Sequence, residues 1–262
     1  MKKLVQANRG SFYLIILVLT NVILHLLFVG KLEYHRDELL YFSLGLHPDF
    51  GYATVPPLIG WIATVMQTLF GYSLFAVKLF PALLSGALVW VSGLIAKELG
   101  GKVYAQVLTG IAIIVMPVSL RAFHLFQPVP IDLFLWTLIL YSVLRYINSK
   151  NDKYLIIIGA VSGLAMLNKY LVMLLVIVLL LSLLLTKHRD IYLKKSFYLG
   201  LGLGTLLFLP NLLWQISKGF PVIGHMQELE ARQLVNVDRF TFLTDQLTMP
   251  FASSLIMILG LI

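Results

Sequence analysis

Residues 34–38 read Tyr-His-Arg-Asp-Glu and place an imidazole, a guanidinium and two carboxylates at four consecutive positions. A carboxylate within hydrogen-bond reach of a hydroxyl can take its proton as the hydroxyl oxygen attacks. Asp37 and Glu38 are therefore candidate catalytic residues, and an ionised Asp37 fits the role of general base. Arg36 would hold this carboxylate ionised or stabilise a substrate charge. The structural alternative is an Arg36–Asp37 salt bridge, which neighbouring side chains make poorly. His35 is another candidate base, although a lone histidine near a membrane interface is more often a structural hydrogen-bonder.

A further carboxylate, Asp132, lies inside the apolar segment FQPVPIDLFLW, residues 126–136. An ionisable group at membrane depth costs a few kcal/mol or more and generally faces a cavity or a partner. Pro128 and Pro130 suit an interrupted entry into a helix, from which Asp132 would turn inward and hold a substrate hydroxyl. The alternative is that Asp132 only starts the helix, where the helix dipole favours a carboxylate.

Lys169 offers a similar choice between a structural and a functional role. It lies in GLAMLNKY, residues 163–170, within an otherwise apolar stretch. Its side chain either extends to a lipid headgroup or faces a cavity and binds a phosphate as a point charge. Gly159 and Gly163, which precede it, are typical of close helix packing.

A divalent metal ion is the one cofactor that these residues suggest. Asp37, Glu38, His124 and Asp132 supply oxygen and nitrogen ligands of suitable types, but their spacing forms no recognised ligand motif, so the sequence leaves a metal open. No cysteine is present, which excludes disulfides, thiolate metal sites and a cysteine nucleophile.

The elements that must position these residues are membrane helices. The 262 residues are 59% hydrophobic and only 12% charged, and the mean hydropathy is +0.90. A soluble domain is about half apolar and about a quarter charged, so the apolar excess predicts an integral membrane protein. The net charge of +8 is explained by the loops between the helices, and we expect membrane lipids around the chain and no nucleic-acid partner.

Eight apolar runs approach the length of spanning helices, about 20 residues each. They are 11–30, 79–96, 103–120, 130–147, 154–171, 171–186, 196–216 and 247–262. As one helix, 154–186 would be about 50 Å long, too long for a hydrocarbon core of about 30 Å. We therefore break it near Asn168-Lys169-Tyr170. The expected fold class is an all-α polytopic membrane protein.

Positive charge orients these helices. Of the 20 Lys and Arg residues, 12 fall in one set of alternating connections: 1–10, 97–102, 145–153 and 187–195. Because Lys and Arg accumulate on the cytoplasmic side, we expect the N-terminus in the cytoplasm and the long connections 31–78 and 217–246 outside. Large outer loops indicate chemistry at that face; the alternative is that they are packed caps.

The two ends of the chain also carry expectations. MKK and the apolar run after it favour a retained first helix over a signal peptide, because no A-x-A-like cleavage site follows. The last run is still apolar at Ile262, which indicates a spanning helix cut at its end. We expect residues 1–262 to form a single transmembrane catalytic domain of about eight spans, a C-terminally truncated fragment of a longer protein.

The candidate residues fall in segments that resemble the bacterial branch of the dolichyl-phosphate-mannose–protein mannosyltransferase family, glycosyltransferase family 39. The segments are HRDELLYFSLG (35–45), GYATVPPLIGW (51–61), LFGYSLFAVKLFPAL (69–83), LFQPVPIDLFLW (125–136), GLAMLNKY (163–170) and LPNLLWQISKGFP (209–221). Each is weakly specific alone, and the ordered set is more specific. The resemblance implies a GT-C-type helical bundle whose large first outer loop carries short amphipathic helices, among which we place Leu58 to Phe70.

The resemblance implies transfer of a sugar from a polyprenyl-phosphate carrier to an acceptor on the non-cytoplasmic face of the bacterial cell membrane, with inversion at the anomeric carbon. An acidic residue in the first outer loop serves as general base in this family. Asp37 matches that position, and Glu38 and Tyr41 complete the D-E-x-x-Y pattern. The sugar and the acceptor, whether lipid, polysaccharide or protein, stay open.

A leaving phosphate gains charge as the sugar bond breaks, so nearby cations stabilise it. The candidate cations, in no order, are Arg36, Lys78, Arg121 and Lys169. His124 is an alternative base. The substrate-binding candidates taken together are Asp132, Lys169, Arg36, His124, Gln127 and Tyr41.

The sequence departs from relatives that modify lipid A with an aminosugar. Those relatives carry Glu-Lys before the proline, where this chain has Thr54-Val55, and an arginine where it has Leu40. Their metal site and phosphate-binding lysine therefore do not carry over.

Two other classes of function fit a membrane protein with embedded charges. A transporter or lipid flippase often shows paired halves with broken helices, and no such symmetry is visible in this sequence. A non-catalytic membrane scaffold is a third reading, against which the embedded Asp132 argues.

Overall fold

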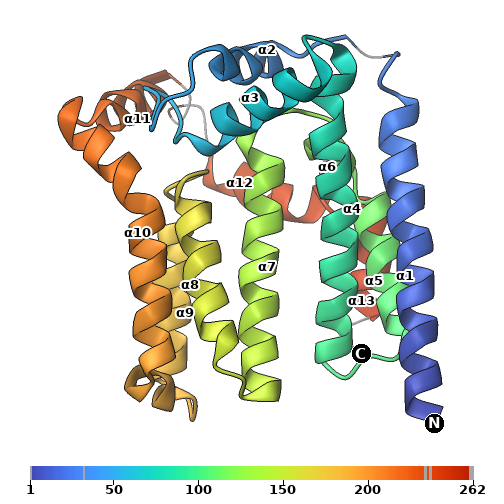
Figure 1. The fold of residues 1–262 in the computed structure, drawn as a ribbon. Helices are drawn as coiled ribbons and strands as arrows, with labels where there is room; N and C mark the ends of the chain where they lie inside the picture. The colour runs from blue at the N-terminus through green and yellow to red at the C-terminus, as the bar shows by residue number, and fades with distance from the viewer. Residues whose placement is uncertain (1, 32, 233–234, 236–237, 260–262) are drawn as a thin grey trace.

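The computed structural model describes residues 2–31, 33–232, 235 and 238–259, and all regular elements in them are helices (Figure 1). The α-helices are α1 (Lys2–Leu27), α2 (Arg36–Ser43), α3 (Leu58–Phe70), α4 (Leu74–Glu98), α5 (Val103–Val115), α6 (Pro117–Ala122), α7 (Pro128–Ser149), α8 (Lys153–Met166), α9 (Val172–Leu184), α10 (Lys195–Ser217), α11 (Pro221–Arg232), α12 (Arg239–Thr248) and α13 (Ser254–Leu259). Short 3₁₀ helices are η1 (Leu44–Leu46), η2 (Arg189–Leu193) and η4 (Phe251–Ser253).

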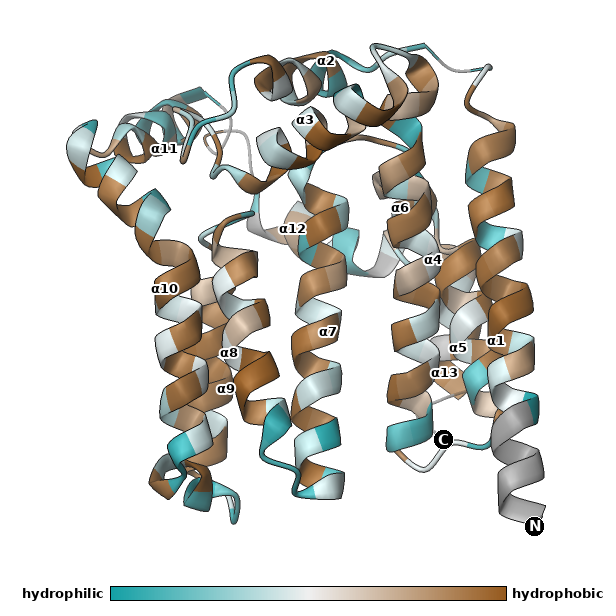
Figure 2. Ribbon diagram, viewed as in Figure 1, coloured by the Kyte–Doolittle hydropathy of each residue, from teal (hydrophilic) through white to brown (hydrophobic). Residues whose placement is uncertain are grey.

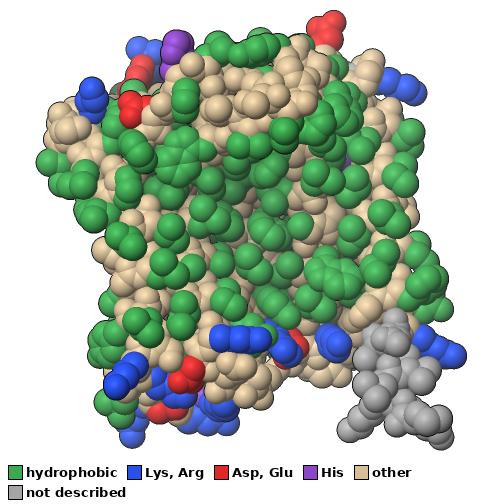
Figure 3. All heavy atoms as spheres, in the orientation of Figure 1, with side chains coloured by type: hydrophobic (Ala, Val, Ile, Leu, Met, Phe, Trp, Pro, Cys, Tyr) green, Lys and Arg blue, Asp and Glu red, His purple; other side chains and the backbone are tan. Residues whose placement is uncertain are grey.

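The longer helices form an upright bundle. Helices α1, α4, α5, α7, α8, α9 and α10 alternate in direction along the chain (Figure 1). Helices α2 and α3 lie across one end of it, which we call the α3 end. The opposite end holds the connections 99–102, 150–152 and 185–194 and gathers Lys and Arg side chains (Figure 3); we call it the basic end.

Four helices are long and apolar enough to cross a membrane: Arg9–Leu27 of α1, and α4, α7 and α10. Helices α5, α8 and α9 are equally apolar but have 13 or 14 residues. Apolar residues colour most of the bundle, and polar ones concentrate at its two ends (Figure 2). The expected all-α polytopic membrane fold is confirmed. Six of the eight expected runs coincide with helices of this bundle, and a seventh, 103–120, does so only in its first part.

The predicted break at Asn168-Lys169-Tyr170 is present, because α8 ends at Met166 and α9 begins at Val172. The backbone N–H of Leu58, the first residue of α3, donates to the carbonyl of Leu167 at 2.9 Å, which satisfies one of the free carbonyls at the end of α8. Asn168 is buried. The turn between α8 and α9 is therefore an interior corner that packs against α3.

Two expected helices need correction. The run 103–120 stops at Val115, because the residue before a proline avoids helical geometry and Pro117 begins α6. The run 247–262 is not one spanning helix in the residues that are described. There α12 ends at Thr248, Pro250 follows, and only the short η4 and α13 come after it. A proline lacks the N–H that would continue the helix. The count of spans in the domain and the side that each end faces stay predictions.

Helices α8 and α10 pack with their backbones in contact. A Cβ added at Gly159 or Gly163 of α8 would overlap the backbone of Gly200 or Gly204 of α10. In the reverse direction, a Cβ at Gly200 would overlap the backbone of Leu155, and one at Gly204 that of Gly159. Small residues spaced by four allow such an approach between membrane helices, which confirms the close packing expected from Gly159 and Gly163. Gly202 on the same helix faces open space.

This contact predicts opposite results at two glycines of α10. Gly204→Ala should destabilise the fold by about 1–3 kcal/mol, the usual cost of forcing an atom into a packed contact. Gly202→Ala should be neutral or stabilising by up to about 1 kcal/mol, since alanine is the better helix former. Thermal unfolding of both variants in the same detergent measures this, and equal midpoints would contradict the packing.

Candidate functional site

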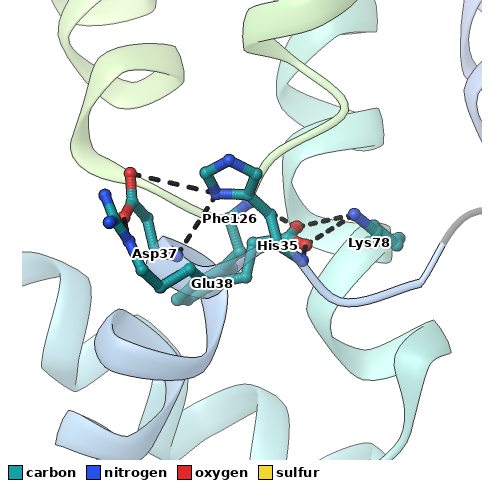
Figure 4. A network of polar contacts seen from close by, with 6 residues as sticks. His35, Asp37, Glu38, Lys78 and Phe126 are labelled. Carbon is teal, nitrogen blue, oxygen red and sulfur yellow. Dashed lines mark hydrogen bonds and ion pairs between the residues drawn. The ribbon is translucent and has the colours of Figure 1, made fainter.

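The polar cluster at the α3 end begins with the cap of α2. His35 is the N-cap residue, and its Nδ1 accepts a hydrogen bond from the backbone N–H of Asp37 at 3.2 Å. The Glu38 carboxylate in turn accepts from the backbone N–H of His35 at 2.9 Å. This reciprocal capping box fixes where the helix begins and so sets the directions of Asp37 and Glu38 (Figure 4).

The Glu38 carboxylate is completely buried and every partner is fixed. Both of its oxygens accept from Lys78 Nζ at 2.7 Å, and Oε1 also accepts from the backbone N–H of Phe126 at 2.9 Å. Lys78, on α4, is 3% exposed and donates its third hydrogen bond to the carbonyl of His124 at 3.0 Å. This buried Glu38–Lys78 network holds α2, α4 and the segment before α7 together (Figure 4).

Burial and saturation give Glu38 and Lys78 a positioning role. A carboxylate that already accepts four hydrogen bonds has no free lone pair directed at a substrate. The three N–H groups of the Lys78 ammonium are likewise all used in hydrogen bonds. The sequence suggested Glu38 as a catalytic residue and Lys78 as a phosphate ligand. In this structure both side chains are buried and their hydrogen-bonding groups are paired, and their roles in the reaction stay predictions.

Asp37 has the opposite environment. Its side chain is 35% exposed, and Arg36 Nε donates to Oδ1 at 3.2 Å, so the contact expected to form poorly does form. His35 Nδ1 lies 3.9 Å from Oδ2. Burial and then the nearby Asp37 carboxylate raise the pKa of the Tyr41 hydroxyl above its usual value. Tyr41 therefore remains a neutral hydrogen-bond donor beside an accessible carboxylate.

One short segment, Phe126–Pro128, joins this cluster to a second one. The N–H of Phe126 donates to Glu38, and the carbonyl of Pro128 accepts from Asn168 Nδ2 at 3.0 Å. Gln127 lies between these two anchors as the N-cap residue of α7, half-buried and with no capping bond from its side chain. The backbone on both sides of Gln127 is thus held fixed.

The second cluster surrounds Asp132 on the second turn of α7. Trp136, Asn168 and Lys169 lie close enough to act on its half-buried carboxylate. Among the described residues, however, Asp132 Oδ1, Trp136 Nε1 and Asn168 Oδ1 are buried and have no hydrogen-bond partner. Buried polar atoms are nearly always paired, and exceptions are frequent at functional sites. This favours an inward-facing Asp132 over a residue that only starts the helix. Lys169 is near enough for its charge to act on the carboxylate.

His124 stands beside the first cluster. Its ring stacks on that of His25 from α1, with centroids 6.5 Å apart. Burial lowers the pKa of His124, the Lys78 ammonium lowers it further, and the Glu38 carboxylate acts in the opposite direction. His124 is accordingly a neutral imidazole at neutral pH, and its Nε2 has no partner among the described residues.

The remaining candidates do not form a metal site. In the part of the chain that is described, no three His, Asp or Glu side chains come together as metal ligands. The Glu38 oxygens are also already taken by Lys78 and two backbone N–H groups. The four suggested ligands therefore do not fit a divalent ion. Arg121, the fourth suggested phosphate ligand, is exposed at the end of α6.

Sequence reasoning missed the network that fixes the loop between η1 and α3. The Asp49 carbonyl accepts from Trp61 Nε1 and its carboxylate accepts from Trp214 Nε1, both at 2.9 Å. Asn211 Nδ2 donates to the carbonyl of Phe50 at 2.6 Å and its Oδ1 accepts from Tyr170 OH at 2.8 Å. The signal available was the polar Asn211 within the apolar run of α10. The network ties the loop to the corner that carries Lys169.

The fold and the candidate site together define the class of protein. This is a multi-pass helical membrane protein with an accessible carboxylate and a cluster of unpaired polar atoms at one end of its bundle. Residues 54–214, more than half of the chain, match the family described as dolichyl-phosphate-mannose-protein mannosyltransferase. The chain belongs to this family, which confirms the resemblance noted above. The match begins at Thr54, so the segment with Asp37 precedes it.

A curated relative adds detail. The lipid A galacturonosyltransferase RgtD of Rhizobium johnstonii is 25% identical over 198 residues, which cover 75% of this chain and 41% of that protein. The chain thus aligns with about two fifths of the length of this relative.

The buried Glu38–Lys78 network predicts a strong energetic coupling between these two residues. Glu38→Gln or Lys78→Met should each cost about 3–5 kcal/mol of folding free energy, since each leaves an unpaired buried group. The double variant should lose much less than the sum, because neither charge remains. A double-mutant cycle on unfolding in detergent measures this, with Arg36→Gln as an exposed control that should change little. Additive losses would contradict the pairing.

Proposed function

We propose that this chain is the membrane-embedded part of a glycosyltransferase that moves a sugar from a polyprenyl-phosphate carrier to an acceptor hydroxyl on the non-cytoplasmic face. Membership of the mannosyltransferase family supports the reaction type. The observation that carries the proposal is the contrast between two adjacent carboxylates. Glu38 is saturated and buried, whereas Asp37 is accessible and fixed by the same capping box.

Asp37 acts as the general base in this proposal. The acceptor oxygen attacks the anomeric carbon, the bond from that carbon to the phosphate oxygen breaks, and the hydroxyl proton passes to the Asp37 carboxylate. Displacement from the side opposite the phosphate inverts the anomeric centre. Arg36 Nε donates a hydrogen bond to Asp37 Oδ1 at 3.2 Å and so helps to fix the direction of this carboxylate.

The Asp132 cluster binds the donor in this proposal. Lys169 meets the phosphate of the carrier, whose charge grows as the sugar bond breaks, so its attraction strengthens toward the transition state. Asp132 Oδ1 would accept from a sugar hydroxyl and Trp136 Nε1 would donate to one, since neither atom has a geometric hydrogen-bond partner among the described residues. Gln127, between the two anchored backbone groups, and the neutral His124 complete the polar lining.

The charge distribution supports an outer location for the α3 end. The basic end carries short connections rich in Lys and Arg, which favour the cytoplasmic side. A lipid acceptor is supported by the name of the R. johnstonii relative, a lipid A galacturonosyltransferase. A lipid acceptor and a lipid-linked donor would both reach the site from within the bilayer.

The first test is transfer by the complete protein in membranes that contain a radiolabelled polyprenyl-phosphate sugar. Asp37→Asn should lower the transfer rate by about 10²–10⁴, the usual contribution of a general base, while the protein stays folded. Glu33→Gln removes an exposed carboxylate from the same loop and should leave the rate unchanged. Transfer that survives in Asp37→Asn would remove Asp37 from the mechanism. No transfer by the wild type from any carrier would favour a transporter or flippase.

The donor-binding role of Lys169 gives a separate prediction. Lys169→Gln should weaken transfer at low donor concentration by about 10- to 100-fold, the worth of a hydrogen bond to a charged group. Lys218→Gln, an exposed cation that follows α10 at the same end, should behave as the wild type. Rates over a range of carrier concentrations measure this. If the transfer rate of Lys169→Gln depends on carrier concentration as that of the wild type does, Lys169 contacts a lipid headgroup and not the donor.

A further inference from the structure

A second group of polar side chains lies at the basic end, away from the site described above. A cavity of about 390 Å³ is lined by Ile147, Lys150, Lys187 and His188. It lies where the end of α7 meets the connection between α9 and η2. Lys150 Nζ lies 3.0 Å from His188 Nδ1, so two nitrogen side chains meet there with no carboxylate between them.

Two neighbouring acids pair with other cations, whereas Asp190 of η2 forms no salt bridge among the described residues. Glu98 pairs with Arg145 at 2.7 Å, and Asp152 pairs with Lys194 at 2.6 Å. Among the described residues, Lys150, Lys187 and His188 take part in no salt bridge. The lining of this cavity, which is open at the exposed Lys150 and Lys187, therefore holds two lysines and no acid.

An apolar cavity of about 210 Å³ lies next to it, between α7, α8, α9 and α10. Its lower wall is made by Leu155, Leu183 and Ile191. These three belong to one buried cluster against which Ile147 of the basic cavity also packs. One layer of side chains is thus shared by the positive cavity and the apolar one.

The apolar cavity opens sideways toward the membrane. Helix α9 packs on α7 and α8, whereas its contact with α10 is slight. Met173 on α9 and Leu201 on α10 both line the cavity, and they are 45% and 53% exposed. An apolar chain can therefore enter between α9 and α10 from the surrounding bilayer.

We propose that this end of the bundle binds one anionic phospholipid from the adjacent leaflet. Its phosphate lies in the basic cavity with Lys150, Lys187 and His188, and one acyl chain lies in the apolar cavity between α9 and α10. Unpaired lysines at the level of the headgroups attract anionic lipids, and only a molecule with both a phosphate and an apolar chain satisfies both cavities. The site is separate from Asp37 and Asp132, which lie at the opposite end.

Native mass spectrometry of the complete protein in detergent tests this site. The probes are phosphatidylglycerol and phosphatidylcholine with identical palmitoyl and oleoyl chains. Wild type should retain one phosphatidylglycerol with about tenfold tighter binding than phosphatidylcholine. Lys150→Gln/Lys187→Gln should abolish that preference. The matched control Lys97→Gln/Lys102→Gln removes two exposed cations from the same end, outside the cavity, and should keep it.

A second pair of variants tests the acyl chain. Thr205→Trp places a large side chain at the lining of the apolar cavity and should weaken retention of both lipids, whereas Leu206→Trp, on an exposed neighbour outside the lining, should not. Equal binding of the two lipids, or equal loss in both double lysine variants, would overturn the proposal. Displacement of phosphatidylglycerol by millimolar inorganic phosphate, with no effect of Thr205→Trp, would assign the site to a free anion and also overturn it.

Discussion

The α3 end depends on one physical constraint, the burial of the Glu38 carboxylate. A buried charge is tolerated only with a partner and with its remaining lone pairs satisfied. Lys78 and two backbone N–H groups meet that demand. In doing so they fix the start of α2 against α4 and against the segment that enters α7. The accessible carboxylate of Asp37 gains its position from this arrangement, although it takes no part in it.

The two polar clusters are connected through backbone groups. Phe126 and Pro128 use a neighbouring N–H and carbonyl to contact Glu38 on one side and Asn168 on the other. Any shift of α2 would therefore be felt at the Asn168 corner, where Lys169 and the Asp132 cluster lie. Two polar clusters that come from distant parts of the chain are thus connected by the three residues Phe126–Pro128, at the entry to α7.

Much of the fold could be predicted from the sequence because membrane helices can be recognised from the length of their apolar runs. The limit of about 30 Å on a hydrocarbon core located the corner at Asn168, and the cost of an embedded charge singled out Asp132. The roles of Asp37 and Glu38 could not be separated, since adjacent residues on a helix point about 100° apart and only the packing decides which one is buried. Lys78 lies 40 residues from Glu38 in the sequence, and no local sequence pattern predicts that they pair. Two helices also end near a proline although the apolar run continues beyond it, α5 at Val115 and α12 at Thr248.

The shortness of α9 has a consequence for the membrane itself. Its 13 residues rise about 20 Å, and its exposed apolar side chains include Leu174, Ile177 and Leu181. A bilayer beside a hydrophobic surface that is too short adapts by thinning. Headgroups next to α9 would then descend toward the level of the Asn168 corner. If the donor is the proposed lipid-linked sugar, its phosphate would then have a shorter distance to travel into the protein than the nominal thickness of the bilayer suggests.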